Sequence, residues 1–384
     1  TWLTSNSERN IEYAKSGIWQ SKNAQRDSTG SGCQLDRKGN RDNSPNGTRY
    51  GSKLIGTGFD VFRRAVKIVQ ARMGIVSNNE KLVTEPRYFE GQVMESLLTN
   101  IHSIEPIPYT DDLDAYFIVI DDPHVYPQVT ITERVLFATG DFTRYEKECS
   151  DNRYSLFGNL GLYFKYLLVT LERYHQICSF HASSMFSPSR NTLLLVVGGP
   201  GAGKTVFLLK GLEEDWRIFS TEMTHFQFTD QGYLFYMGSL YDNIRVGNLI
   251  YDFPQAKEKL SLEIPDVADP WGHKIAIDMG TIAAQPHYLN PRVTVVDARI
   301  ESGRDIPIVK TITRREKIAK LLLDNATEKF VSPFVMYDRI PVESLDTPDL
   351  MARRLEAMYR FVDQVSLNPV KSTLAGAQNC MEGI

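Results

Sequence analysis

The pattern of apolar and polar positions divides the chain into a polar beginning and a long patterned body. Residues 1–55 are rich in Ser, Asn, Gly, Gln and Arg and contain little that could be buried, so we predict a flexible tail there. Apolar residues recur at helical spacing over 59–71, which predicts a helix. Apolar runs at 115–121 and 133–140 predict strands. Together these elements predict a small α+β subdomain over 56–150.

Beyond residue 150 the pattern is that of an α/β domain. A heavy apolar face over 156–177 predicts a helix, and strand-like and helix-like runs follow it. The predicted strands cover 179–186, 193–197, 217–228, 233–238, 273–280 and 292–299, and the further helices end near 212 or cover 311–326 and 348–365. The last residues, 371–384, predict a loose end. We expect one α/β domain over 151–345 and a C-terminal helix with a loose end over 346–384.

Composition narrows the class of protein. The chain has 384 residues, is 42% hydrophobic and carries a net charge of -4, which gives no general electrostatic case for nucleic acid. Its apolar runs are shorter than the roughly twenty residues of a membrane span, so we expect no membrane segment. The chain begins with Thr1 and not with a methionine, which is compatible with a leader that processing has removed. Four scattered cysteines, without a C-x-x-C pair, favour a reducing cytoplasm: Cys33, Cys149, Cys178 and Cys380.

The stretch LLLVVGGPGAGKTVFLLKGL, residues 193–212, fits a strand, a glycine-rich loop and a helix. Residues 198–205 match G-x-x-x-x-G-K-T, a pattern whose backbone N–H groups converge on phosphate oxygens. Lys204 can reach the terminal phosphates, and the Thr205 hydroxyl can bind a magnesium ion. We therefore expect ATP, or another nucleoside triphosphate, and Mg²⁺. The predicted nucleotide-binding residues are Gly198, Gly199, Pro200, Gly201, Ala202, Gly203, Lys204, Thr205 and Val206.

A water-activating ATPase typically has an apolar strand that ends in Asp-Glu. The strand-like run VTVVD ends at Asp297, but Ala298 and Arg299 follow it. The other acidic pair, Asp121 and Asp122, precedes the loop and is better explained by a strand-to-turn role. The sequence thus argues against a mechanical ATPase.

Two further residues flank the loop at about twenty positions on either side. His181 lies in FHASSM, and Glu222 lies in RIFSTEMTHF. With the loop between them, this arrangement over about 155–240 resembles the HPr kinase/phosphorylase group. Its members share a nucleotide-binding core with ATP-dependent phosphoenolpyruvate carboxykinase. The resemblance implies a P-loop α/β core and transfer of the γ-phosphoryl group to a hydroxyl, commonly that of a serine in a protein or peptide.

The resemblance also implies roles for individual residues. Lys204 and Thr205 would hold the phosphates and magnesium, and His181 would lie beside the transferring phosphate. Glu222 falls where the family has an acidic pair, as the base or a metal ligand. This chain has Thr221 before Glu222 instead of two aspartates, so one carboxylate acts alone or a distant acid helps, with Asp278 and Asp297 as candidates.

Other residues are less specific. The family's Glu-x-Arg-Gly signature has no convincing copy, although RIESGRD at 299–305 contains the same residue types in another order. Arg299 and Arg304 are candidates for a phosphate clamp, against the blander interpretation of solvated loop charges. We place His225 on a strand surface.

The leading hypothesis is a kinase whose acceptor is a hydroxyl of a protein, a peptide or a small molecule. An alternative is a nucleotide-gated regulatory protein with incidental ATP hydrolysis. A carboxykinase-like enzyme would need a metal-ligating Lys/His/Asp set that the sequence does not supply. The acceptor, the choice between ATP and GTP, and the oligomeric state, including a homo-oligomer, stay open.

Overall fold

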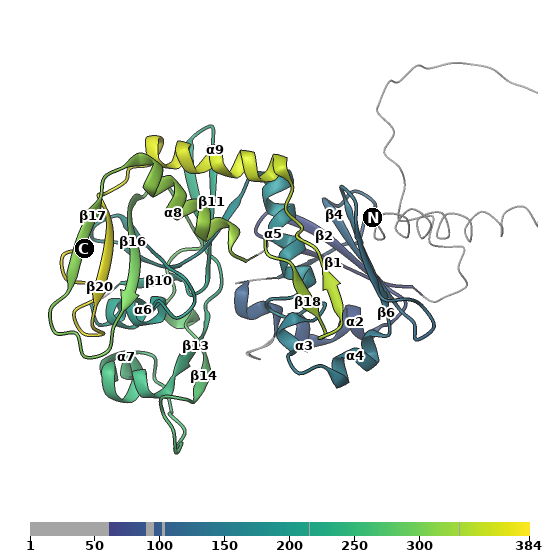
Figure 1. Cartoon of the computed structure of the whole chain (residues 1–384), viewed down its shortest axis with the longest axis horizontal. Coiled ribbons are helices and arrows are strands. Elements are labelled where there is room, and N and C mark those ends of the chain that lie inside the picture. Colours follow the sequence, from purple (N-terminus) through teal and green to yellow (C-terminus); the bar gives the residue numbers. More distant parts are fainter. Residues whose placement is uncertain (1–60, 90–95, 102–103, 215, 330) are drawn as a thin grey trace, which may run out of the picture. The chain divides into compact units, whose positions relative to one another are not determined.

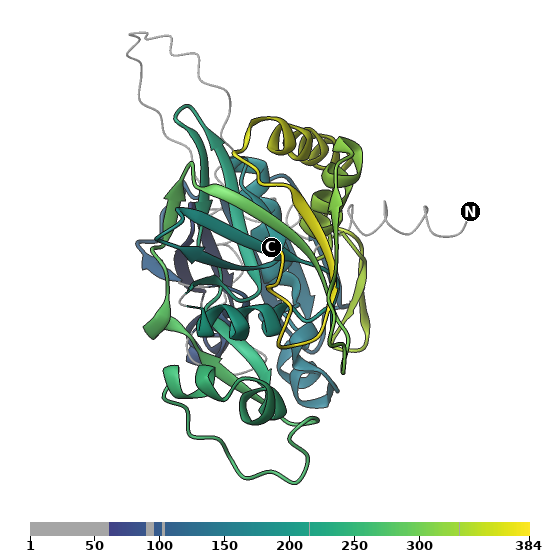
Figure 2. The same cartoon turned by 90° about the vertical axis from the view of Figure 1, so that its left-hand side faces the viewer.

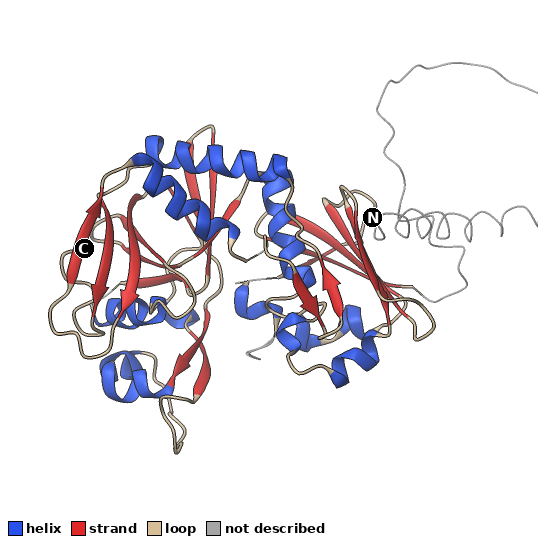
Figure 3. Cartoon of the chain, in the orientation of Figure 1, coloured by secondary structure: helices blue, strands red, loops and turns tan. Residues whose placement is uncertain are grey.

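A computed structural model describes residues 61–384 except 90–95, 102, 103, 215 and 330. The predicted tail, 1–55, lies outside these residues. The described part is a mixed α/β structure with several sheets, which confirms the α/β class (Figures 1 and 3). Three of its sheets have four or more strands, and two are short two-stranded ribbons.

The first sheet has six strands in the order β3-β1-β2-β4-β6-β5. Its strands are β1 (Phe62–Ile68), β2 (Ala71–Ser77), β3 (Glu105–Ile107), β4 (Ala115–Asp121), β5 (Gln128–Ile131) and β6 (Val135–Gly140). Helix α5 (Leu162–His175) is buried over most of its length in the core on one face. The predicted boundary at 150/151 separates this helix from the sheet with which it shares a core.

The predicted helix over 59–71 is wrong from residue 62 onward, because β1 and β2 form a hairpin there. The apolar residues of this segment fit both periods, and β-branched residues such as Val66 and Ile68 pack well in strands. Val69, which also fits the helical spacing, lies in the turn of the hairpin with a positive φ of 55°. Pairing of the two strands therefore decided the structure.

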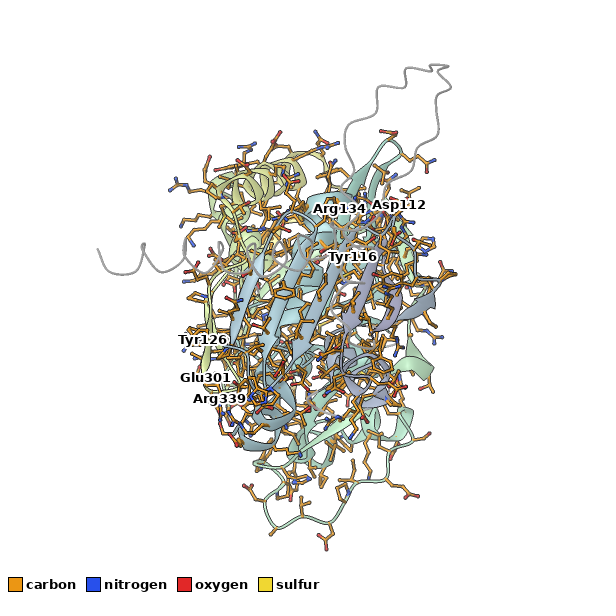
Figure 4. The ribbon with its side chains drawn as sticks, turned by 90° about the vertical axis from the view of Figure 1, so that its right-hand side faces the viewer. Asp112, Tyr116, Tyr126, Arg134, Glu301 and Arg339 are labelled. Atoms are coloured by element: carbon orange, nitrogen blue, oxygen red, sulfur yellow. The ribbon has the colours of Figure 1, made fainter. Side chains whose placement is uncertain are left out.

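The opposite face of the first sheet carries a separate apolar cluster that contains Ala65, Val76, Leu113, Tyr116 and Ile118. Figure 4 shows Tyr116 on this face, below Arg134 and Asp112. Short elements complete this region: α2 (Lys81–Thr84), α3 (Pro86–Phe89), η2 (Leu97–Asn100), α4 (Phe142–Glu148), η3 (Asn152–Tyr154), β18 (Phe334–Met336) and β19 (Ile340–Val342).

The second sheet also has six strands, in the order β10-β8-β9-β16-β20-β17. They are β8 (Ser183–Ser187), β9 (Thr192–Val197), β10 (Arg217–Ser220), β16 (Arg292–Ile300), β17 (Ile308–Ile312) and β20 (Val370–Ala375). Strands β9, β16 and β20 run parallel to one another. The predicted loose end is wrong, since β20 lies between β16 and β17 as an interior strand (Figures 1 and 2).

The third sheet has the order β15-β12-β11-β7. Its strands are β7 (Cys178–His181), β11 (Met223–Thr229), β12 (Gly232–Tyr236) and β15 (His287–Leu289). Two predicted strands are therefore split between sheets. The run 179–186 forms β7 and β8, and the run 217–228 forms β10 and β11.

Helices cover the second and third sheets, and one ribbon adjoins them. The elements are α6 (Lys204–Glu213), β13 (Tyr241–Arg245), η4 (Asn248–Asp252), α7 (Pro254–Lys259), β14 (Lys274–Asp278), η5 (Gly280–Ile282), α8 (Arg315–Thr327) and α9 (Pro348–Gln364). Helices α8 and α9 lie together, joined by the Arg315–Asp363 ion pair (Figure 3). The helix predicted over 311–326 begins later, at Arg315, because 308–312 is strand β17.

Within the described residues no helix combines the length and the apolar content that crossing a bilayer requires. Cys149, Cys178 and Cys380 are free thiols, and Cys33 lies outside the described residues.

Candidate functional site

The glycine-rich loop, residues 198–203, connects strand β9 to helix α6 in the order that the motif predicts. Gly203 has a φ of 95°, and a Cβ there would collide with Ile300 of β16. Only glycine fits such a position without strain. At the other end of the loop, the Gly198 N–H donates a hydrogen bond of 3.2 Å to the side chain of Asn325 on α8. The loop is thus held between the sheet and α8.

Lys204 is the first residue of α6, so its position follows from the end of the loop. Its Nζ donates to the carbonyl oxygens of Gly198 at 2.8 Å and Gly199 at 3.4 Å. Burial lowers the pKa of Lys204, while the charges of Glu222 and Glu328 oppose that shift. The ammonium group therefore lies at the loop and within the electrostatic range of both carboxylates.

His181 and Glu222 come together because the chain crosses twice between the second and third sheets. One crossing runs from β7 to β8 directly after His181, and the other runs from β10 to β11 through Thr221 and Glu222. The strands pair on both sides of the crossings, with Ser220 opposite Ser184 and Met223 opposite His181. Thus the two residues that the sequence places on either side of the loop are neighbours.

The second crossing is also fixed by hydrogen bonds. The Thr221 N–H donates to the carbonyl oxygen of Ser239 at 2.8 Å, and its hydroxyl donates to that of Tyr241 at 2.6 Å. Thr221, the residue that stands where the resemblance leads us to expect an acid, is buried and 2% exposed. It therefore anchors the start of β13 and leaves Glu222 free to face His181.

Four ionisable side chains form a cluster at this crossing, which we call the acid–histidine cluster: His181, Glu222, Glu328 and Lys329. The His181 Nε2 lies 3.1 Å from Glu222 Oε1, and its Nδ1 lies 2.7 Å from Glu328 Oε2. Lys329 Nζ also donates to Glu222 Oε1, at 2.7 Å. The imidazole ring therefore lies between two carboxylates.

The cluster keeps its carboxylates ionised. Burial by itself would raise the pKa of Glu222, but hydrogen bonding to His181 and the charge of Lys329 hold that pKa well below its usual range. The Glu222 side chain is 30% exposed. For Glu328 the effect of burial is likewise outweighed by His181, and its pKa is lowered. Glu222 is thus a charged hydrogen-bond acceptor that is still accessible.

Sequence reasoning missed a second carboxylate, that of Asp242 on β13. It lies within hydrogen-bonding reach of the Thr205 side chain, and burial together with the charge of Glu222 raises its pKa to about 7. Its Oδ2 is buried and has no hydrogen-bond partner. The only available signal was an acid in a short strand after the Thr-Glu turn, and that strand had not been predicted.

Magnesium requires oxygen ligands in near-octahedral geometry, and it is commonly held by one or two carboxylates together with substrate phosphates. Among the described residues no group of three or more His, Cys, Asp or Glu could hold a metal by itself. The Thr205 hydroxyl and the Asp242 carboxylate nevertheless supply two neighbouring oxygen donors beside the loop, and the unpartnered Oδ2 is suited to a cation. The residues fit a magnesium ion that is bound together with a polyphosphate.

The other candidate acids lie elsewhere. Asp278 is exposed on β14 and accepts the Gly280 N–H. Asp297 accepts a hydrogen bond of 3.1 Å from the Ser372 hydroxyl, and burial raises its pKa. No described interaction joins either of them to Glu222. The carboxylate that the charge of Glu222 acts on is that of Asp242.

Five further residues have structural roles or different positions. Asp121 accepts from the Thr143 hydroxyl and Asp122 from the His124 N–H, which bears out their strand-to-turn interpretation. Arg304 pairs with Glu301, whereas Arg299 is exposed. The surface position expected for His225 is wrong.

His225 is 2% exposed, and its Nδ1 lies 2.7 Å from the Ser179 hydroxyl. Burial lowers its pKa to about 4. Its strand pairs on both sides, with β7 and with β12, and a central strand with helices over the sheet has no solvent face at this point.

No protein-family model matches the chain, and no curated protein sequence is significantly similar to it.

Proposed function

We propose that the protein is an ATP-dependent kinase that transfers a γ-phosphoryl group to a hydroxyl of a protein, peptide or small molecule. The observation that carries the proposal is the convergence of three features at the end of strand β9. These are the loop with Lys204 and Thr205, the carboxylate pair Glu222 and Asp242, and His181. We further propose that the loop is a P-loop and that its core is of the HPr kinase/carboxykinase type.

The loop binds the polyphosphate. Its backbone N–H groups and the N-terminal end of α6 favour negative charge, and Lys204 moves from the loop carbonyls to the β- and γ-phosphates. Thr205 and Asp242 would hold Mg²⁺, which would supply charge neutralisation on the phosphates, and Asp242 would serve as its ligand in the deprotonated form.

Glu222 orients the acceptor. Its lowered pKa makes it a weak base, but phosphoryl transfer proceeds through a loose transition state in which positioning and charge neutralisation dominate. A carboxylate that is ionised and 30% exposed accepts the hydrogen bond of an incoming hydroxyl. The Lys329 ammonium group and the His181 ring fix its orientation, and Lys329 contributes positive charge at the carboxylate.

The proposal is tested by incubating the protein with γ-labelled ATP, Mg²⁺ and a fractionated cell extract. Label that moves to an acceptor and resists the acid conditions that hydrolyse phosphohistidine indicates transfer to a hydroxyl. Glu222→Gln is the matched control, because it keeps the loop and the shape of the side chain. Nucleotide binding without transfer by the unaltered protein would favour the nucleotide-gated regulator, and binding of neither ATP nor inorganic tripolyphosphate would refute the nucleotide site.

A further inference from the structure

A cleft of about 790 Å³ opens beside the glycine-rich loop, and the acid–histidine cluster contributes nothing to its walls. It is lined by Gly198, Gly199, Pro200, Gly201, Ala202, Asp297, Ala298, Arg299, Ile300, Ile308, Lys310, Ser372, Thr373 and Leu374. These residues come from the loop and from strands β16, β17 and β20, on one side of β9 in the sheet order. Strands β8 and β10, which lead into the cluster, lie on the other side.

The strand directions place this cleft at the edge of the sheet where open α/β sheets commonly bind ligands. Strands β9, β16 and β20 are parallel, so their carboxyl ends meet at one edge of the sheet. In open α/β sheets, ligands bind in the crevice outside the carboxyl ends of the strands. The loop residues 198–202 line the cleft whereas Lys204 and Thr205 do not. A polyphosphate held by the loop therefore has one end near Thr205 and the other end open to the cleft.

The lining combines apolar surface, a carboxylate and cations. Ile308 and Leu374 are paired in the ladder between β17 and β20, and Ile308 is 44% exposed. The polar pair of Asp297 and Ser372 adjoins them in register. Within the described part of the chain, no hydrogen bond or ion pair engages the exposed Arg299 or Lys310 side chains. The volume is also within the usual range for small-molecule pockets.

We propose that this cleft binds the nucleoside part of the triphosphate, a role that rests on the proposed function. The base packs against Ile308 and Leu374, Asp297 accepts hydrogen bonds from a ribose hydroxyl or a base N–H group, and Arg299 and Lys310 face the inner phosphate. The γ-phosphate then points toward Glu222 and Asp242. The phosphoryl acceptor consequently enters from the side of the acid–histidine cluster and does not share the nucleoside cleft.

The test compares the affinities of ATP and inorganic tripolyphosphate, each with Mg²⁺, by calorimetry on the full chain. Leu374→Trp fills the cleft, so ATP affinity is expected to fall at least about tenfold while tripolyphosphate affinity stays within about twofold. Ile308→Ser removes an exposed apolar contact without adding bulk and is expected to weaken ATP alone by about threefold to fivefold. Ile131→Ser is its matched control, since Ile131 is 37% exposed on edge strand β5 of the first sheet.

The outcomes separate this inference from the proposed function. Selective loss of ATP affinity in Leu374→Trp and Ile308→Ser, with Ile131→Ser unchanged, supports the nucleoside cleft. If unaltered protein binds tripolyphosphate as tightly as ATP, or if the Ile308→Ser and Ile131→Ser proteins bind ATP alike, the cleft assignment is overturned while the phosphate site survives. Binding of neither ligand by the unaltered protein overturns both.

Discussion

Two hydroxyl–carboxylate pairs flank the glycine-rich loop, and their surroundings differ. On one side Asp242 lies within reach of Thr205, and on the other Asp297 accepts from Ser372. The pKa of both carboxyl groups is raised by burial. Asp242 also faces the negative charge of Glu222, whereas Asp297 lies in a cleft with Arg299 and Lys310. The shift of Asp242 thus includes repulsion from a second carboxylate, whereas that of Asp297 has no charged contributor.

Because their surroundings differ, the two sides of the loop suit different parts of one ligand. A concentration of carboxylates attracts a divalent cation and a hydroxyl donor, and it repels phosphate unless a metal or a lysine intervenes. An open cleft with aliphatic walls and two cations suits an uncharged ring attached to an inner phosphate. We therefore expect substitutions on the two sides of the loop to affect different measurements.

The largest expected effect is that of Lys204→Ala. Without this charge the terminal phosphates lose their contact, so transfer should fall by about a thousandfold or more, and triphosphate binding should weaken more than diphosphate binding. Lys310→Ala removes the same charge from the cleft and should change transfer by less than about tenfold. The measurement is label transfer at saturating ATP, with affinities for ATP and ADP. Unchanged turnover in the Lys204→Ala protein would contradict the kinase assignment.

Glu222→Gln should separate chemistry from binding. The amide keeps the size of the side chain but loses the charge that His181 and Lys329 hold in place, so transfer should fall by at least about a hundredfold. ATP affinity should change little, because the loop is intact. The check is the transfer rate beside a nucleotide titration of the same protein. Equal rates in the two proteins would remove Glu222 from the site.

The parts of the site that could be predicted from sequence are those whose chemistry is local. The loop is one uninterrupted motif between an apolar strand and an apolar helix, so its order along the chain fixes its position in the fold. His181 and Glu222 were predicted from a resemblance based on their spacing around that motif. Both lie at crossings between sheets, and alternation along the chain gave two long strands because it does not show where a strand changes sheets.

Non-local pairing explains what the sequence did not reveal. Asp242 belongs to a short strand that pairs only with β14, more than thirty residues later, and nothing beside it in the sequence marks it as a neighbour of Thr205. Strand β20 arises from a segment with few apolar residues, and its place between β16 and β17 depends on partners seventy residues or so earlier. Such pairing overrides local propensity.

The smallest expected effect concerns the free energy of unfolding, for which Asp242 and Asp297 are again expected to differ. Burial and the charge of Glu222 raise the pKa of Asp242 to about 7 from its ordinary value of 3.8, so the folded protein binds more protons than the unfolded chain between about pH 4 and 7. The free energy of unfolding therefore falls as the pH rises through this window, because the carboxylate must ionise in a buried site beside Glu222. Asp242→Asn removes this proton uptake.

The asparagine variant should accordingly be about as stable as the unaltered protein at pH 4 and more stable at pH 8, by about 1 to 2 kcal/mol after allowance for the partial exposure of the residue. Urea unfolding at the two pH values measures the difference. Asp297→Asn is the matched control, and its effect should be smaller because burial raises the pKa of Asp297 without a neighbouring carboxylate. If Asp242→Asn follows the same pH dependence as the unaltered protein, Asp242 is not under repulsion from Glu222. If Asp297→Asn gains as much as Asp242→Asn, burial alone accounts for both shifts, and the acidic side of the loop has no special preference for a cation.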